Sequence, residues 1–167
     1  FGKKSTLVFP FRINGAKYIS IGKKAHVNEG SWMLAFKNSE KDPVIKIGSG
    51  AYIGRFVHIV AVNRIDIKEN VAMADKVYIS DNAHNYEDVN TLMKEQDILD
   101  YGPVVIGENT WLGENACIMG ASIGKHCVIG VNAVVTKDIP DYSIAVGSPA
   151  KVIRQYNQAT KKWEKVS

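Results

Sequence analysis

The stretch from Ile79 to Asp88, ISDNAHNYED, contains His84, a residue that could do acid–base chemistry. An imidazole can accept a proton near neutral pH, so this histidine is a candidate general base. Tyr86, Glu87 and Asp88 follow it closely and could contact a substrate or orient the ring. An exposed polar residue without a function would look the same in isolation. The hypothesis therefore depends on what the surrounding chain builds.

The elements that must position His84 are visible as a six-residue repeat. Aliphatic residues recur at every sixth position, as in IGSGAY–IGRFVH from Ile47 and IGKHCV–IGVNAV from Ile123. The fifth position of each unit is small or β-branched, and Gly or Asn often stands near the unit ends, where tight turns favour them. Neither an amphipathic helix nor a single alternating strand has this period. It predicts an all-β solenoid of short parallel strands around one apolar column, whereas a β-sandwich has no reason to keep it.

Two polar segments interrupt the repeat, at about residues 35–44 and 85–102. In the six-residue register Ala83 is an inward fifth position, so His84 points outward where the longer segment leaves. A solenoid needs no insertion for its stability, and insertions on one face tend to build binding surfaces. We therefore expect residues 85–102 to form an active-site loop beside His84.

The repeat ends near Pro149, which makes residues 1–150 the expected repeat domain. The last coil of a solenoid exposes apolar core and unpaired backbone groups unless something covers them. Beyond Pro149, four residues recur at helical spacing: Val152, Tyr156, Ala159 and Trp163. The spacing predicts a C-terminal α-helix over residues 151–167 that caps the last coil.

Composition narrows the possible functions. The chain is 46% hydrophobic and 23% charged with a net charge of +4, which fits a globular protein with an anionic ligand and argues little for nucleic acid. No apolar run is long enough to cross a bilayer. Cys117 and Cys127 have neither metal-ligand spacing nor a disulfide framework, so we expect a cytoplasmic protein. Any membrane proximity would come from the acceptor or from a segment preceding Phe1. The four histidines lack the close pair that a shared metal site would need, so no metal is expected.

The repeats and ISDNAHNYED, together with the segment from Gly102 to Asn157, resemble the hexapeptide-repeat acyltransferases. Within that family they are most similar to the galactoside, maltose and polysaccharide O-acetyltransferases, over about residues 19–154. The resemblance implies a left-handed parallel β-helix, although the six-residue period itself carries no hand. It also implies that His84 is the catalytic base and that acetyl-CoA is the acyl donor. Asn82 stands where many relatives carry a second histidine.

The same resemblance implies two sets of binding residues. The expected acceptor contacts are Asn82, Tyr86, Glu87 and Asp88. Lys and Arg side chains among the donor contacts would suit the phosphates of CoA. The expected donor contacts are Trp111, Glu114, Val131, Thr136, Lys137, Lys151 and Arg154. Direct transfer needs no covalent enzyme intermediate, and Cys117 lacks the paired histidine that a cysteine nucleophile would have.

The function implied is an acetyl-CoA-dependent O-acetyltransferase acting on a sugar hydroxyl, in the biosynthesis of bacterial surface polysaccharide. Two alternatives stay open within enzymes: an N-acetyltransferase of a nucleotide-linked amino sugar, and a drug acetyltransferase. A non-catalytic hexapeptide scaffold is the alternative outside enzymes. The resemblance also implies a homotrimer, in which His84 of one subunit meets donor-side residues of the next.

Overall fold

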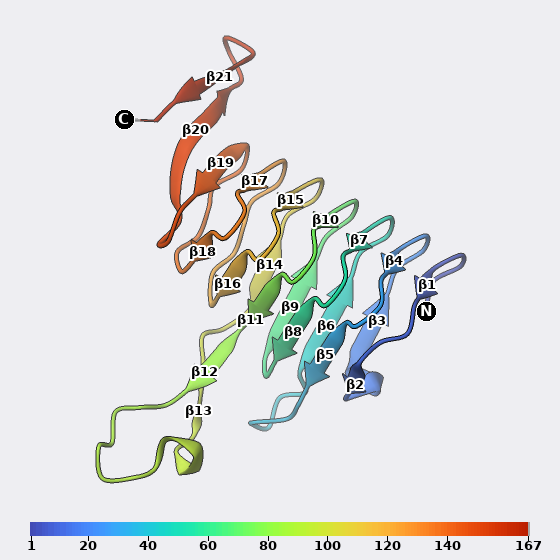
Figure 1. Cartoon of the computed structure of the whole chain (residues 1–167), viewed down its shortest axis with the longest axis vertical. Coiled ribbons are helices and arrows are strands. Elements are labelled where there is room, and N and C mark those ends of the chain that lie inside the picture. The colour runs from blue at the N-terminus through green and yellow to red at the C-terminus, as the bar shows by residue number, and fades with distance from the viewer. Residues whose placement is uncertain (167) are drawn as a thin grey trace.

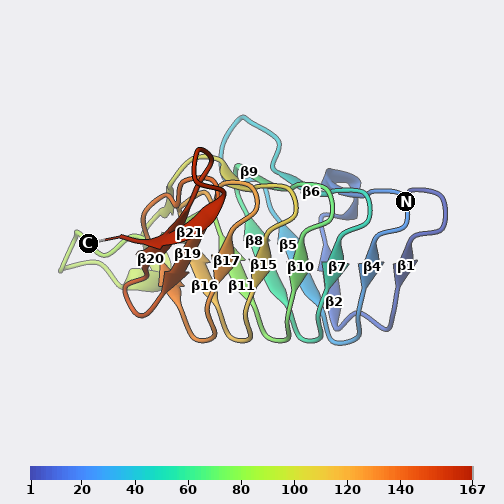
Figure 2. The same ribbon diagram turned by 90° about the horizontal axis from the view of Figure 1, so that it is seen from above.

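The computed structural model describes residues 1–166, and these form a prism of stacked coils (Figure 1). Successive coils contribute short strands to three sheets, called here faces A, B and C, and strands of successive coils pair in parallel. The turns between these faces are the AB, BC and CA corners. Figure 2 shows the coils following one another along the prism, with the first and last at opposite ends. The expected all-β solenoid is confirmed.

Faces A and B carry most of the strands. In order across the sheet, face A consists of β1 (Thr6–Leu7), β4 (His26–Val27), β7 (Tyr52–Ile53), β10 (Ala72–Met73), β15 (Trp111–Leu112), β17 (Val128–Ile129), β19 (Ser143–Val146), β20 (Lys151–Asn157) and β21 (Lys162–Lys165). Along the chain, face B consists of β2 (Arg12–Asn14), β5 (Trp32–Ala35), β8 (His58–Ala61), β11 (Tyr78–Ser80), β16 (Cys117–Met119) and β18 (Val134–Val135).

Face C is shorter and is continued by single bridges. Its strands are β3 (Ile19–Ile21), β6 (Val44–Ile47), β9 (Arg64–Ile67) and β14 (Val104–Ile106), and bridges from Ile106 to Ile123 and from Ile123 to Ile139 extend it. A separate pair of antiparallel strands is formed by β12 (Asn82–His84) and β13 (Ile98–Asp100). Two 3-10 turns complete the elements, η1 (Ala16–Tyr18) and η2 (Met93–Glu95).

Inward side chains fill the prism with one apolar column. Ile53 on face A, Ile118 on face B and Ile65 on face C are fully buried. The small fifth positions are buried too, as Ala25 and Cys127 illustrate, because little space is left beside a corner. Backbone groups are paired from coil to coil, so that stacking satisfies the hydrogen bonds that a single short strand leaves open.

Both excursions leave the prism at the BC corner. The shorter one connects β5 to β6, and the longer one is an arm built from β12, β13 and the loop between them. The arm projects away from the prism in Figure 1. The two excursions touch, since the Asn38 side-chain amide donates a hydrogen bond to the Ile98 carbonyl at 3.3 Å. The inward position expected for Ala83 is wrong: the chain leaves the coil before it, and Ala83 lies half-buried in the arm.

The predicted C-terminal helix is also wrong. The strands β20 and β21 form an antiparallel hairpin that extends face A beyond β19. The open edge of β19 offers backbone partners to β20, and this long-range pairing overrides a helical spacing of apolar residues. Tyr156 and Trp163 pair across the hairpin, with ring centroids 5.6 Å apart. The hairpin therefore covers the strand edge that the helix was expected to cap.

Among residues 1–166 we find no helix with the length and apolar character needed to cross a membrane.

Candidate active site

The root of the arm is a buried polar cluster at the BC corner. Ser80 and Asp81 are fully buried, and Asn82 is 8% exposed. The Asp81 carboxylate accepts hydrogen bonds from the backbone N–H groups of Val62 and Asn63, at 2.8 and 2.9 Å. These donors belong to the preceding coil, so Asp81 ties the start of the arm to the body of the prism.

Asn82 completes this cluster. Its side-chain amide donates to the Val60 carbonyl at 3.1 Å and to the Asp81 carboxylate at 2.9 Å. The Ser80 hydroxyl donates to the Asn82 carbonyl at 2.6 Å, which fixes the backbone at the point of departure. Asn82 is therefore held by the protein on both amide hydrogens, and only its side-chain oxygen is left for the acceptor contact predicted from the sequence.

His84 is the last residue of β12 and is exposed. Its Cα lies opposite that of Ile98 in the antiparallel pair, and the neighbouring Asn85 N–H donates to the Asp97 carbonyl at 3.1 Å. Within residues 1–166 the His84 ring makes no hydrogen bond, so both ring nitrogens are open to an incoming ligand. The antiparallel pair thus presents a free imidazole two residues beyond the buried Asn82.

The carboxylates after His84 do not orient it. The Asp88 carboxylate accepts hydrogen bonds from the Thr91 hydroxyl at 2.7 Å and the Asn90 N–H at 2.9 Å. These bonds, that of Thr91 first, lower the pKa of Asp88 below its ordinary value. Asp88 therefore shapes the tip of the arm. Glu87 and Tyr86 are exposed beside it, and the Tyr86 side chain, at 64% exposure, is free to contact a ligand.

A small pocket of about 260 Å³ lies where the arm meets the prism, lined by Tyr101, Met119, Gly120 and Thr136. Gly120 has a φ of 59°, and a β-carbon there would lie 2.7 Å from the Tyr101 side chain. Glycine therefore lets Tyr101 close over this corner. Of the donor contacts predicted from the sequence, Thr136 lines this pocket and Lys137 follows it at the same corner.

The other predicted donor residues lie on the opposite side of face B. Trp111, at 42% exposure, points outward from face A, and Arg154 lies on the same face three strands further on. Glu114 stands at the AB corner, where its carboxylate pairs with the Lys76 ammonium at 3.3 Å. Val131 is one coil further along that corner at 55% exposure, and Lys151 begins β20 beside it. The structure therefore divides the predicted donor set between the BC corner and the AB corner with its adjoining face A.

Several residues of this site were not predicted from the sequence: Ser80, Asp81, Tyr101, Met119 and Gly120. For Asp81 the sequence offered one signal: it is an acidic residue two positions after the aliphatic Ile79, just before the repeat is interrupted. The others are brought together by the stacking of coils and carry no local signal. Among residues 1–166, no three His, Cys, Asp or Glu side chains come close enough together to hold a metal ion.

Comparison with known proteins identifies the family of this chain. Residues 103–137 match the family model described as the hexapeptide repeat of succinyl-transferase. WbbJ of Escherichia coli K12, assigned as a lipopolysaccharide biosynthesis O-acetyl transferase, is 33% identical over 164 residues, which cover 94% of this chain and 82% of that protein. The chain belongs to the hexapeptide-repeat acyltransferases. A second relative, Rv3034c of Mycobacterium tuberculosis H37Rv, is assigned as an acetyltransferase and is 38% identical over 137 residues, or 81% of this chain. This acyltransferase chain spans 44% of the length of Rv3034c.

Solved structures agree with the family. A maltose O-acetyltransferase from Clostridium difficile 630 is 27% identical with a TM-score of 0.64, and the match covers 95% of this chain and 70% of that one. Galactoside acetyltransferase in complex with coenzyme A is 29% identical with a TM-score of 0.56, over 82% of this chain and 72% of that one. The N-acyltransferase AntD from Bacillus cereus, 15% identical with a TM-score of 0.76 over 95% of this chain and 85% of that one, supports the fold alone. The prism of this acyltransferase is a left-handed parallel β-helix.

Proposed function

We propose that this chain transfers an acetyl group from acetyl-CoA to a sugar hydroxyl, with His84 as the general base. The observation that carries the proposal is the free His84 imidazole on a strand whose root is locked by Asp81. A general base must be held in place and still be open to the proton it removes. The assignment of WbbJ to lipopolysaccharide biosynthesis supports a bacterial surface polysaccharide or its precursor as the acceptor.

In the proposed reaction His84 removes the proton from the acceptor hydroxyl as its oxygen attacks the carbonyl carbon of the acetyl thioester. Backbone N–H groups stabilise the oxyanion that forms. The carbon–sulfur bond then breaks, and the imidazolium returns its proton to the departing CoA thiolate. The enzyme forms no covalent bond. Cys117 is a poor nucleophile because it is half-buried, and burial raises the pKa of its thiol.

The division of the donor residues supports a site shared between subunits. Thr136 and His84 belong to the BC corner of one copy, while Trp111, Val131 and Arg154 lie at or beyond its AB corner. A closed threefold assembly would bring the BC corner of each copy against the AB corner of the next. We therefore propose a homotrimer with its active sites between subunits.

The surface of face B favours the same assembly. The rings of Trp32 and His58 stack at 4.2 Å, Tyr78 follows them, and all three are only partly exposed. Trp32 Nε1 and His58 Nε2 are buried without a hydrogen-bond partner. Burial lowers the pKa of His58. An aromatic face of this kind suits contact with further copies of the chain.

The catalytic proposal is tested by replacing His84 with alanine. The side chain is exposed and contributes nothing to the core, so the fold and the affinity for CoA should be kept. Acetyl transfer should fall by about 10²–10⁴-fold, the usual contribution of a positioned general base. The measurements are kcat/KM with maltose, galactoside and amino-sugar acceptors, and calorimetry with CoA. His126→Ala serves as the matched control, since that ring bonds to Asn109 and stacks on Tyr142 away from the arm. Near-normal turnover of His84→Ala would refute the role of His84.

Mixed assemblies test the shared site. One variant carries His84→Ala, and the other carries Lys151→Ala and Arg154→Ala. When the two are refolded together in equal amounts, a site that takes one part from each of two copies is intact in about one quarter of cases. Activity should therefore reappear on mixing two inactive proteins. A site built within one copy predicts no recovery at all, and a particle mass of a single chain in light scattering would also contradict the trimer.

The free cysteines fit the cytoplasmic location that we propose for the enzyme.

A further inference from the structure

Charge is distributed very unevenly along the prism axis. Residues 1–24 contain six of the 21 basic residues and none of the 17 acidic ones, so this segment carries +6. The remainder of the chain carries −2 and leaves the whole protein at +4. Residues 1–24 form the first coil and the turn after it, at one end of the prism (Figures 1 and 2). The positive charge of the protein is therefore concentrated at its N-terminal end.

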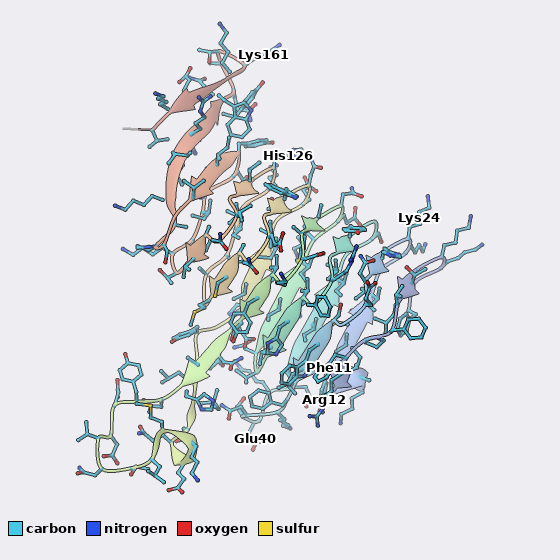
Figure 3. The ribbon with its side chains drawn as sticks, in the orientation of Figure 1. Phe11, Arg12, Lys24, Glu40, His126 and Lys161 are labelled. Carbon is cyan, nitrogen blue, oxygen red and sulfur yellow. The ribbon has the colours of Figure 1, made fainter. Side chains whose placement is uncertain are left out.

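Four lysines stand together at the CA corner of this end. Lys3 and Lys4 belong to the first turn and Lys23 and Lys24 to the next, and the Lys24 N–H donates to the Lys3 carbonyl at 3.1 Å. All four are exposed, and none forms an ion pair with a carboxylate of residues 1–166. In Figure 3 the labelled Lys24 points away from the ribbon into open space. These ammonium groups are available to an anionic partner.

Two carboxylates of the first coils are already engaged elsewhere. Asp42 pairs with Lys37 at 3.6 Å and accepts a hydrogen bond from the Tyr18 hydroxyl at 3.1 Å. Glu29 of the second coil pairs with Arg55 of the third at 3.4 Å. Neither carboxylate is paired with the lysines of the CA corner, so the positive field there is not locally neutralised.

Exposed aromatic rings lie on the same coil. Phe9 is 86% exposed, and Phe11, whose ring lies edge-on to that of Trp32 with centroids 6.0 Å apart, is 73% exposed. Phe9 sits at the AB corner with a φ of 31°, a backbone conformation that a phenylalanine rarely adopts. The labelled Phe11 and Arg12 in Figure 3 belong to that same coil. Exposed apolar side chains on the same coil as a cluster of charged ones can contribute apolar contacts to a binding surface.

We propose that the N-terminal end of the prism docks on a membrane surface containing anionic phospholipids. Lysine ammonium groups attract phosphate headgroups, and exposed phenylalanine rings enter the boundary between headgroups and acyl chains. A soluble polyanion would use the lysines and have no need of the phenylalanines, so the combination favours a lipid surface. This docking is separate from the proposed active site, because His84 leaves the prism on the fourth coil, three coils away.

The test is cosedimentation of the protein with vesicles of phosphatidylcholine, with and without phosphatidylglycerol. Binding should require phosphatidylglycerol and weaken as salt is raised. The variant Lys3→Gln, Lys4→Gln, Lys24→Gln should bind about a hundredfold more weakly, at about fivefold for each lysine. The control Lys161→Gln, Lys162→Gln, Lys165→Gln removes the same charge from exposed positions at the opposite end and should bind like the parent. Phe9→Asn, which suits a positive φ, should weaken the binding that survives at high salt. Thermal unfolding should show that all variants remain folded.

Each contrary result overturns the proposal in a recognisable way. If both triple variants lost vesicle binding equally, binding would depend on the net charge of the protein and not on the lysines of the N-terminal end. Binding that dextran sulfate displaces and that Phe9→Asn leaves unchanged would assign the surface to soluble polyanions. A fall in particle mass in the Lys3, Lys4, Lys24 variant would mean that a second copy of the chain occupies this end. Absence of binding to phosphatidylglycerol vesicles would reject the surface outright, and none of these results would bear on the role of His84.

Discussion

Replacing Asp81 with asparagine tests whether the buried cluster at the root of the arm positions His84. The substitution keeps the size of the side chain and removes its charge. One Asp81 oxygen accepts the Val62 N–H and the Asn82 amide, and the other accepts the Asn63 N–H at 2.9 Å. Asparagine can keep its oxygen toward Val62, but its NH₂ group then faces the Asn63 N–H, donor against donor.

The expected loss of stability follows from these contacts. The Asn63 N–H loses its partner at a partly buried site, which costs about 1–3 kcal/mol. The remaining hydrogen bonds lose a charged acceptor, and bonds to charged groups are about twice as strong as neutral ones, which adds about 1 kcal/mol. The free energy of unfolding should therefore fall by about 2–4 kcal/mol. The lost hydrogen bonds lie at the root of the arm that carries His84, so kcat should fall as well. The affinity for CoA should stay close to that of the parent.

Two assays check this expectation. Urea denaturation measures the free energy of unfolding, and steady-state acetyl transfer beside CoA calorimetry separates the two sides of the site. Asp75→Asn is the matched control: its carboxylate also accepts a backbone N–H of the preceding coil, that of Arg55 at 2.8 Å, but at an exposed corner away from the arm. That control should lose less than about 1 kcal/mol and keep its kcat.

The reasoning would be refuted by a variant Asp81→Asn that loses stability and keeps full kcat. Asp81 would then hold the coil together without positioning His84. A loss of CoA affinity as large as the loss of kcat would also contradict the reasoning. The hydrogen bonds of Ser80, Asp81 and Asn82 involve no residue of the predicted donor set.

Three further predictions concern the prism. Ile118→Ala, at a fully buried position of face B, should lower the free energy of unfolding by about 2–5 kcal/mol, measured by urea denaturation; a cost below 1 kcal/mol would contradict the assigned core. Cys127 should react with a thiol reagent only on unfolding in a Cys117→Ser background, because burial shields its thiol and raises its pKa, and rapid native labelling would reject the inward register. Burial alone would raise the pKa of Asp66, but hydrogen bonds from Arg64 and Lys68 outweigh it and lower that pKa below 3.8. This carboxylate therefore stabilises the fold above pH 3.8, and the contribution is lost as pH falls through the lowered pKa. Asp66→Asn should be less stable at neutral pH and lose less stability in acid, and parallel pH profiles for the two proteins would exclude the linkage.

The sequence predicted the coils well because the six-residue period is a local property. Whether Ile53 or Ala25 points inward depends on its place within one hexapeptide, and both are buried as predicted. The prediction failed where the chain pairs with distant segments. Ala83 was assigned to a coil because it continued the period, but the backbone after Asp81 pairs with β13 instead. The helical spacing in residues 151–167 was likewise real, but it was overridden by pairing with β19.

The sequence by itself determined the solenoid, the two excursions from it and the candidate base, because each depends on neighbouring residues and on motifs that can be read along the chain. Only the tertiary structure decided what holds His84 in place, since the donors to Asp81 come from residues 62 and 63 of the previous coil. It alone also showed that the predicted donor residues lie on either side of face B, some at the BC corner and the others at the AB corner or on face A. Distances between corners depend on how many residues each turn takes and how the coils stack. A hexapeptide pattern specifies which way a side chain points, and the stacked coils specify which side chains meet.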